Sequence, residues 1–269
     1  MLYFVATPIG NLKDISFRAI EVLKQVDIIA CEDTRHSLRL LDAYEIKKPL
    51  VSYHKFNEQA SSEKLIEELK NGKDIAVISD AGTPIISDPG SVLVEKLIQE
   101  KIEFTVVPGA CAFVPALILS GLTKGRFLFY GFLPEKNSEI KKQLKKLENL
   151  EFPIIFYCAP HDIKKTIKAI YETFGSRKCV AVREITKLHE ERIEFDLEQG
   201  YNGEERGEFV VIVDGATEVA TSYPQDILEH YNLYISQGLS KNDSIKQVAK
   251  DRGVVKNEIY KYILENENK

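Results

Sequence analysis

Short apolar segments that alternate with segments carrying helix signals through the first half of the chain constrain its fold more than any other feature. The apolar segments predict strands near 2–6, 27–30, 49–52, 74–78 and 103–107. The segments between and after them predict helices near 16–25, 35–44, 58–71, 91–100 and 110–120. Strands this apolar, each followed by a helix, are typical of a mainly parallel sheet covered on both faces. The first half is therefore predicted to be an α/β domain.

The pattern changes after the glycine-containing segment 121–125. Strands are expected near 127–131, 154–157, 179–183, 193–196 and 208–213, and clear helices only near 137–149 and 161–174. Successive strands without a helix between them predict antiparallel pairing, and hence a second, mixed α/β domain. The segment 141–146 is basic, which a solvated helix face explains most simply.

A polar connection at 216–223 precedes a helical tail. Ser240 and Asp243 begin one helix with a capping-box-like pair, Gly253 ends it, and 256–264 forms the next. This spacing resembles a helix-turn-helix, although a helical hairpin that only packs has the same pattern. The predicted domains are therefore an N-terminal α/β domain over 1–121, a mixed α/β domain over 122–217 and a helix-turn-helix-like tail over 218–269.

Loops rich in Gly, Pro and Asp follow three of the predicted strands, at 7–11, 79–90 and 108–112. Open α/β sheets bind their ligands at the carboxyl ends of the strands, so three such loops predict one shared crevice. Each loop alone has the composition of an ordinary turn. Neither a G-x-x-x-x-G-K-[ST] nor a G-x-G-x-x-G motif occurs, which argues against the usual nucleotide-phosphate cradle.

Composition narrows the class of protein. The 269 residues carry a net charge of −5 and are 44% hydrophobic, as in ordinary globular proteins. No run of 18 apolar residues and no basic leader is present, so neither a membrane span nor a signal peptide is expected. The four cysteines are far apart and the histidines are scattered, which predicts a reducing, cytoplasmic location and no metal site.

Eight sequence blocks, in order along the chain, resemble the tetrapyrrole-methylase superfamily. They are Ala-Thr-Pro-Ile-Gly-Asn-Leu at 6–12, Cys-Glu-Asp-Thr-Arg at 31–35, Ser-Asp-Ala-Gly-Thr-Pro-Ile-Ile-Ser-Asp-Pro-Gly at 79–90, Val-Pro-Gly at 107–109, Gly-Phe-Leu-Pro at 131–134, Ile-Phe-Tyr at 155–157, Arg-Glu-Ile-Thr-Lys at 183–187 and Arg-Gly-Glu at 206–208. Within that superfamily, the chain is most similar to members that 2′-O-methylate a cytidine ribose of 16S rRNA. The resemblance covers essentially the whole chain. It implies two α/β domains in a tetrapyrrole-methylase-like fold, S-adenosylmethionine in the crevice between them, the 30S subunit as partner and usually a homodimer.

The resemblance also implies site residues. Those expected to bind the cofactor are Pro8, Ile9, Gly10, Asp80, Gly82, Thr83, Pro84, Ile86, Cys111, Ala112, Tyr157 and Gly215. Those expected to contact RNA are Glu32, Arg35, His54, Arg183, Lys256 and Lys261. Because a ribose hydroxyl is weakly acidic, a base or hydrogen-bond acceptor is needed, and the candidates for catalysis are Asp33, Glu184 and Lys187.

Several of these residues have a purely structural alternative. Asp33 has the position of a helix N-cap, and Asp80 that of a loop-capping residue. The basic candidates Arg35, Arg183 and Lys187 have acidic neighbours in the sequence with which they can pair. A lone loop histidine such as His54 is more often incidental.

Two other functions fit parts of the sequence. A small-molecule methyltransferase of the same superfamily would methylate a precorrin-type tetrapyrrole carbon. A noncatalytic nucleic-acid-binding regulator would use Lys256, Asn257 and Lys261. The polar segment 32–35 and the helical tail favour RNA over a macrocycle, and the three crevice loops argue against a mere binder.

Overall fold

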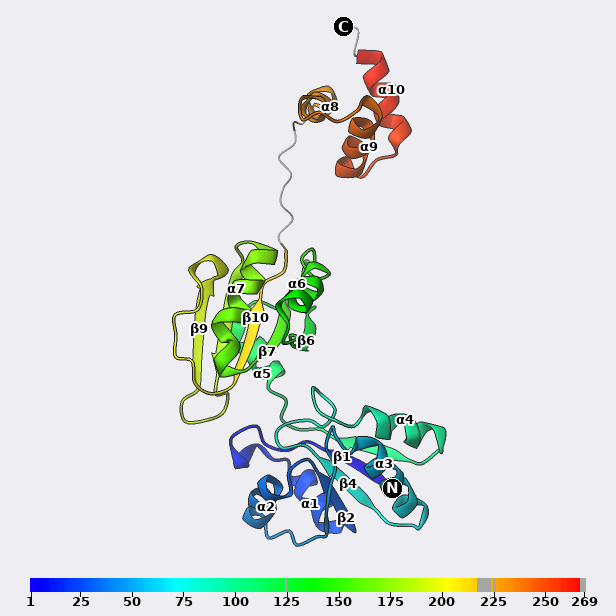
Figure 1. Cartoon of the computed structure of the whole chain (residues 1–269), viewed down its shortest axis with the longest axis vertical. Coiled ribbons are helices and arrows are strands. Elements are labelled where there is room, and N and C mark those ends of the chain that lie inside the picture. Colours follow the sequence, from blue (N-terminus) through cyan, green and yellow to red (C-terminus); the bar gives the residue numbers. More distant parts are fainter. Residues whose placement is uncertain (124, 217–223, 225, 267–269) are drawn as a thin grey trace. The chain divides into compact units, whose positions relative to one another are not determined.

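The computed structural model describes residues 1–123, 125–216, 224 and 226–266 (Figure 1). The chain forms two compact units, 1–216 and 217–269. The larger unit contains two five-stranded sheets, and the smaller contains three helices in its described part. No helix in the described ranges is long and apolar enough to cross a membrane.

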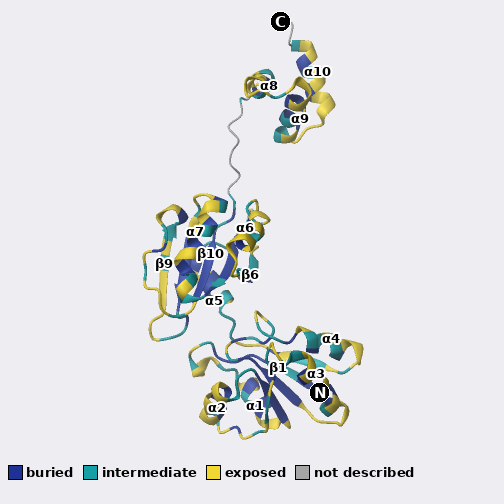
Figure 2. Ribbon diagram, viewed as in Figure 1, coloured by how far each residue is buried: buried dark blue, intermediate teal, exposed yellow. Residues whose placement is uncertain are grey.

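The first sheet is wholly parallel, as the apolar strands predict. Its strands are β1 (Leu2–Val5), β2 (Ile28–Cys31), β3 (Leu50–Ser52), β4 (Ile75–Ile78) and β5 (Phe104–Val107), in the order β3-β2-β4-β1-β5. Helices α1 (Phe17–Gln25) and α2 (Thr34–Ala43) pack on one face, and α3 (Glu58–Lys70) and α4 (Ser91–Gln99) on the other. Because both faces are covered, the central strands β1, β2 and β4 are buried along most of their length, whereas the edge strands β3 and β5 are partly exposed (Figure 2).

The second sheet is mixed. Its strands are β6 (Leu128–Phe132), β7 (Ile154–Cys158), β8 (Lys178–Arg183), β9 (Glu191–Asp196) and β10 (Phe209–Val213), in the order β6-β7-β10-β8-β9. Strands β6 and β7 are parallel, since α6 (Asn137–Lys145) connects them, and the other pairs are antiparallel. Helices α6 and α7 (Ile163–Phe174) pack on one face.

Helix α5 (Phe113–Ser120), expected as the last helix of the first domain, packs on the second sheet instead. Its Ala116 and Leu117 lie in one core with Ile155, Val182 and Val210. Helix α5 therefore covers one face of the second sheet, and α6 and α7 cover the other. The division of the chain at residue 121 stays a prediction.

The C-terminal unit contains α8 (Ile227–Ser236), α9 (Lys241–Arg252) and α10 (Lys256–Asn266). Ser240 caps α9, because its hydroxyl accepts a hydrogen bond from the amide of Asp243 at 3.2 Å. Gly253 ends the helix in the left-handed conformation. The core of this unit is apolar and comes from all three helices. The polar connection expected at 216–223 lies almost entirely outside the described residues.

Candidate active site

The loops that follow β1, β2, β4 and β5 are tied together at the carboxyl edge of the first sheet. The amide of Thr7 donates to the carbonyl of Gly82 at 2.8 Å, and the amide of Gly82 donates back at 3.1 Å. The hydroxyl of Thr83 donates to the carbonyl of Ala110 at 3.0 Å. The amide of Asp33 donates to the Asp80 carboxylate at 3.2 Å. The loops therefore meet, as their positions after parallel strands indicate.

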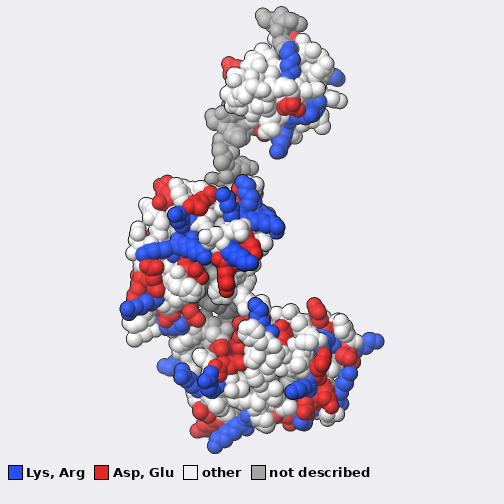
Figure 3. Space-filling view, viewed as in Figure 1, with Lys and Arg blue, Asp and Glu red and all other residues white. Residues whose placement is uncertain are grey.

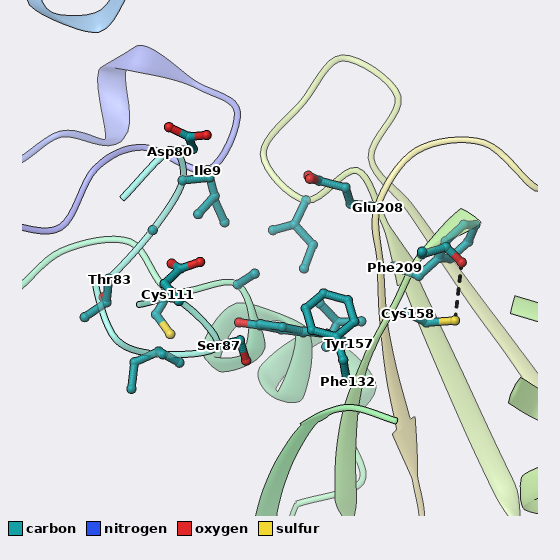
Figure 4. A pocket seen from close by; sticks show the side chains of 18 of the residues that line it. Ile9, Asp80, Thr83, Ser87, Cys111, Phe132, Tyr157, Cys158, Glu208 and Phe209 are labelled. Carbon is teal, nitrogen blue, oxygen red and sulfur yellow. Dashed lines mark hydrogen bonds between the residues drawn. The ribbon is translucent and has the colours of Figure 1, made fainter. Parts of the chain in front are cut away.

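A cavity of about 410 Å³ lies against these loops (Figure 4). Its lining residues from the first half of the chain are Ile9, Asp80, Ala81, Gly82, Thr83, Ile86, Ser87, Asp88, Cys111 and Ala112. Those from the second half are Phe132, Tyr157, Cys158, Ala159, Pro160, Ile185, Lys187, Glu208, Phe209 and Val210. A mostly apolar lining with a few charged groups, in a cavity of this size, is typical of a small-molecule site.

The loop 79–90 contains unusual backbone conformations. Ile85 and Ser87 have φ angles of 76° and 68°, which are costly for residues with a side chain and most costly for a β-branched one. The end of the loop is anchored by Glu58 of α3, whose carboxylate accepts hydrogen bonds from the amides of Gly90 at 2.8 Å and Val92 at 3.2 Å. Strain of this kind is concentrated at functional sites.

Carboxylates give part of the cavity a negative charge. Asp80 and Asp88 line it, and Glu32 is close enough to affect both Asp88 and His54. Burial, followed by the negative charges of Glu32 and Asp80, raises the pKa of Asp88 to about 6. Asp88 is absent from the residues predicted for the site, although it belongs to the loop 79–90 that the sequence singles out.

A lysine between two glutamates lies elsewhere on the cavity lining. The ammonium of Lys187 donates to the carboxylates of Glu184 and Glu208, each at 2.9 Å. Burial opposes the charged form, but hydrogen bonds to Glu208 and Glu184 raise the pKa of Lys187 above its usual value. Burial likewise opposes ionisation of Glu184, but hydrogen bonds from the Glu208 amide and Lys187 lower its pKa. Lys187 is therefore a fixed cation and Glu184 a fixed anion.

Gly10 and Gly207 leave the space that the side chains of Lys187 and Glu184 occupy. A Cβ atom on Gly10 would overlap the aliphatic part of Lys187, and one on Gly207 would overlap that of Glu184. Both glycines also have positive φ angles, of 154° and 81°, which disfavour any other residue. The first loop and the segment 184–187 are thus in direct contact.

Aromatic side chains form the remaining lining, with Tyr157 extending from β7 toward Cys111 (Figure 4). Its ring packs edge-on against Phe132 at 5.5 Å and Phe129 at 5.0 Å between centroids. Burial is the main cause that raises the pKa of both Tyr157 and the Cys111 thiol. Both groups are therefore neutral at physiological pH.

Many of the predicted cofactor residues line this cavity, as does one predicted catalytic residue. Those that line it are Ile9, Asp80, Gly82, Thr83, Ile86, Cys111, Ala112, Tyr157 and Lys187. Pro8, Gly10 and Pro84 belong to the same loops but do not line the cavity. The cavity lies at the N-terminal end of β10, where Phe209 lines it. Gly215 follows the C-terminal end of that strand and packs on the backbone of 151–152.

The other predicted catalytic residues lie behind the lining. Asp33 is the N-cap of α2: its carboxylate accepts from the Arg35 amide at 2.8 Å and pairs with the Arg35 guanidinium at 3.3 Å. These interactions, first the side-chain hydrogen bond from Arg35, lower the pKa of Asp33. Glu184 does not line the cavity, but its carboxylate accepts hydrogen bonds from two residues that do, Lys187 and Glu208, each at 2.9 Å.

The predicted RNA-contacting residues are dispersed. Arg183 is buried, and its guanidinium is engaged by two exposed carboxylates, those of Glu191 at 2.9 Å and Glu204 at 3.1 Å. Arg35 is exposed. Glu32 and His54 lie near each other, and Nδ1 of His54 has no hydrogen-bond partner among the described residues. Lys256 and Lys261 are exposed on α10 of the C-terminal unit.

Within the described ranges, no group of three or more His, Cys, Asp or Glu side chains is arranged to hold a metal ion.

Comparison with known proteins gives a consistent result. Residues 1–199 match the family model of the tetrapyrrole (corrin/porphyrin) methylases. The ribosomal RNA small subunit methyltransferase I of Bacillus subtilis (strain 168) is 44% identical over 270 residues, covering 97% of this chain and 92% of that protein. The protein of the same name from Pasteurella multocida (strain Pm70) is also 44% identical, with 100% and 98% covered.

Solved structures share the fold at low sequence identity. The methyltransferase CobJ matches with a TM-score of 0.62 at 17% identity, covering 80% of this chain and 94% of that one. Diphthine synthase matches with a TM-score of 0.59 at 15% identity, covering 79% and 89%. At these identities the likeness concerns the fold alone.

Proposed function

The chain belongs to the tetrapyrrole methylase family, and on that premise we propose that it methylates small-subunit ribosomal RNA with S-adenosylmethionine as methyl donor. The observation that carries this proposal is the near full-length similarity to proteins named ribosomal RNA small subunit methyltransferase I. We further propose that the acceptor is the 2′-hydroxyl of a cytidine ribose in 16S rRNA, presented by the 30S subunit.

The residues of the cavity fit the proposed donor. S-adenosylmethionine, when bound, supplies a methyl group on a positively charged sulfur atom. Asp80 supplies negative charge for its cationic groups, and Ile9, Ile86 and Ala112 supply apolar surface for the adenosine. A cavity of about 410 Å³ has the volume that a ligand of this size needs.

The chain's part in the chemistry is to position the hydroxyl, receive its proton and exclude water. We propose Asp88 as the proton acceptor, because it lines the cavity and its pKa of about 6 makes it more basic than an ordinary carboxylate. Lys187 stays protonated and supplies a positive charge for the acceptor oxygen or a phosphate. Glu184 positions Lys187, and Asp33 positions Asp80 through its backbone amide.

A homodimer is also proposed. On α5, Val114 and Ile118 are 45% and 71% exposed, and Val106 of the edge strand β5 is 46% exposed. Apolar side chains on an otherwise packed helix and on a sheet edge are typical of a surface that a second copy covers. Ribosomal RNA as substrate places the enzyme in the cytoplasm.

The acceptor distinguishes this function from a tetrapyrrole methyltransferase. Purified protein is incubated with radiolabelled S-adenosylmethionine and, in separate reactions, undermethylated 30S subunits, naked 16S rRNA or a precorrin-type tetrapyrrole. The expected result is label in the RNA, recovered as 2′-O-methylcytidine after nuclease digestion. Label in the tetrapyrrole alone would support the alternative enzyme, and label in no acceptor would support a binding protein.

A further inference from the structure

Two further cavities lie next to the active-site cavity, near helices α6 and α7. A second, smaller cavity shares Phe132, Tyr157, Cys158 and Ala159 with the first. A third, of about 390 Å³, shares Ile140 and Lys165 with the second. The three cavities are therefore neighbours on the larger unit, and we call the third, which is lined by residues of α6 and α7, the lysine groove.

The lysine groove is strongly basic in an acidic protein. Segments 136–146 and 160–174, which contain both helices, have eight lysines and three acidic residues, whereas the whole chain has a net charge of −5. Figure 3 shows lysine and arginine side chains gathered over α6 and α7 on the face in view. Lysines concentrated on two neighbouring helices produce a local positive potential that the total charge conceals.

The lysines belong to both walls of the groove. Lys141 of α6 and Lys165 and Lys168 of α7 line the third cavity together with Asn137 and Thr173. Two basic helices that face each other across a groove repel, so solvation of a single helix face does not account for this arrangement. This arrangement gives Lys141 a role other than that of a solvated helix face, which is the explanation that the sequence favours for the basic segment 141–146.

These lysines are available to an anion. Lys141 has no carboxylate partner within 4 Å among the described residues, and Lys165 donates to the backbone carbonyl of Glu135 at 3.1 Å. Lys168 pairs with Glu172 at 3.9 Å, with both side chains exposed. An exposed pair at this distance is worth little and is readily exchanged for a phosphate.

We propose that the lysine groove binds the phosphodiester backbone of the RNA strand whose ribose enters the active-site cavity, an inference that rests on the proposed function. None of the residues that line the third cavity is aromatic, so the groove offers no platform for stacked bases. Lysine ammonium groups with the Asn137 amide suit phosphate oxygens instead. The groove therefore fixes the path of the strand and leaves recognition of the base to the active-site cavity.

The test removes the three charges together. The variant Lys141→Gln/Lys165→Gln/Lys168→Gln is compared with a control, Lys24→Gln/Lys47→Gln/Lys64→Gln, which removes three exposed lysines elsewhere on the same unit. If each groove lysine meets one phosphate, the slope of log K against log salt for single-stranded RNA falls by about 2. The KM for RNA is expected to rise at least tenfold, while the calorimetric Kd for S-adenosylmethionine stays unchanged.

The outcomes are separable. If the wild-type enzyme methylates RNA and the groove variant keeps the KM and the salt slope of the control, the lysine groove does not bind the RNA backbone, and the proposed function still holds. If the wild-type protein labels no RNA, both fail. Should the groove variant not fold, acetylation of the wild-type protein decides instead: bound RNA must protect Lys141, Lys165 and Lys168 more than Lys24, Lys47 and Lys64, and equal protection would overturn the proposal.

Discussion

The candidate role of Asp88 follows from its surroundings in the structure and not from its local sequence. In the sequence it is one of several small polar residues of a turn, and nothing local distinguishes it from Asp80. In the structure it lies on the cavity lining, near Glu32 and Asp80, and burial with these charges raises its pKa to about 6. A long-range environment creates this property, so no motif could have predicted it.

The first prediction concerns catalysis. Asp88→Asn keeps the size of the side chain and removes the base, so kcat is expected to fall by about 10²- to 10⁴-fold while the Kd for S-adenosylmethionine changes only a few-fold. Single-turnover methylation and calorimetry measure the two. In the wild-type enzyme, log kcat should rise with pH below about 6 and level off above it, because Asp88 must lose its proton to act.

The control is Asp42→Asn, which changes an exposed carboxylate of α2. It should leave both constants unchanged. An Asp88→Asn enzyme that keeps more than half of the wild-type kcat would show that Asp88 is not the proton acceptor, as would a rate that does not fall on acidification to pH 5.

The second prediction concerns stability. The folded-state pKa of Asp88, about 6, lies above the ordinary value of 3.8, so ionisation of Asp88 destabilises the folded state. The free energy of unfolding should therefore fall as the pH rises from about 4 to 6. Asp88→Asn should therefore be more stable than wild type at pH 8, by about 1 kcal/mol once solvent screening is allowed for. Near pH 4 most of the difference should vanish. Urea unfolding at both values checks this, and a variant less stable at pH 8 would contradict it.

At the scale of elements, the sequence predicted the strands of the first sheet, but it did not predict that helix α5 packs on the second sheet. Strands covered on both faces have continuous apolar runs, which is why β1, β2 and β4 were predicted close to their observed bounds. The partly exposed edge strands β3 and β5 are also close to the predicted ranges. Helix α5 has apolar residues nearly all round, as both exposed Ile118 and buried Leu117 show. Such a helix has no amphipathic face to indicate its partner, so its packing on the second sheet could not be predicted.

The third prediction concerns the connection between α3 and α4. Helix α4 has Gly90 at its N-cap and no side-chain cap of its own, and Glu58 of α3 accepts hydrogen bonds from the amides of Gly90 and Val92 instead. Glu58→Ala should lower the free energy of unfolding by about 1–2 kcal/mol, as loss of a helix cap does. Because Gly90 ends the strained loop 79–90, affinity for S-adenosylmethionine should also fall several-fold.

Urea unfolding and calorimetry test both parts, with Glu67→Ala as control, since Glu67 is an exposed residue of the same helix. Unchanged cofactor affinity in a destabilised Glu58→Ala protein would mean that the anchor serves the helix and not the site.

At the scale of the molecule, the described residues that line the active-site cavity and the lysine groove all lie in one of the two compact units, 1–216. The C-terminal unit has its own apolar core and exposes Lys256 and Lys261 on α10. A net charge of −5 does not reveal the local cluster of lysines on α6 and α7, because acidic residues elsewhere outweigh it.

This division gives the last prediction, on the full-length chain. Lys256→Glu/Lys261→Glu should leave the Kd for S-adenosylmethionine unchanged, because the described residues that line the active-site cavity all belong to 1–216. If α10 contacts RNA, reversing two charges should raise the KM for 30S subunits about tenfold or more, with a smaller effect at high salt. The matched control is Lys24→Glu/Lys64→Glu on the larger unit. Equal KM values for the two variants would show that the helix-turn-helix-like pair only packs, and that the RNA contacts of this enzyme lie on residues 1–216.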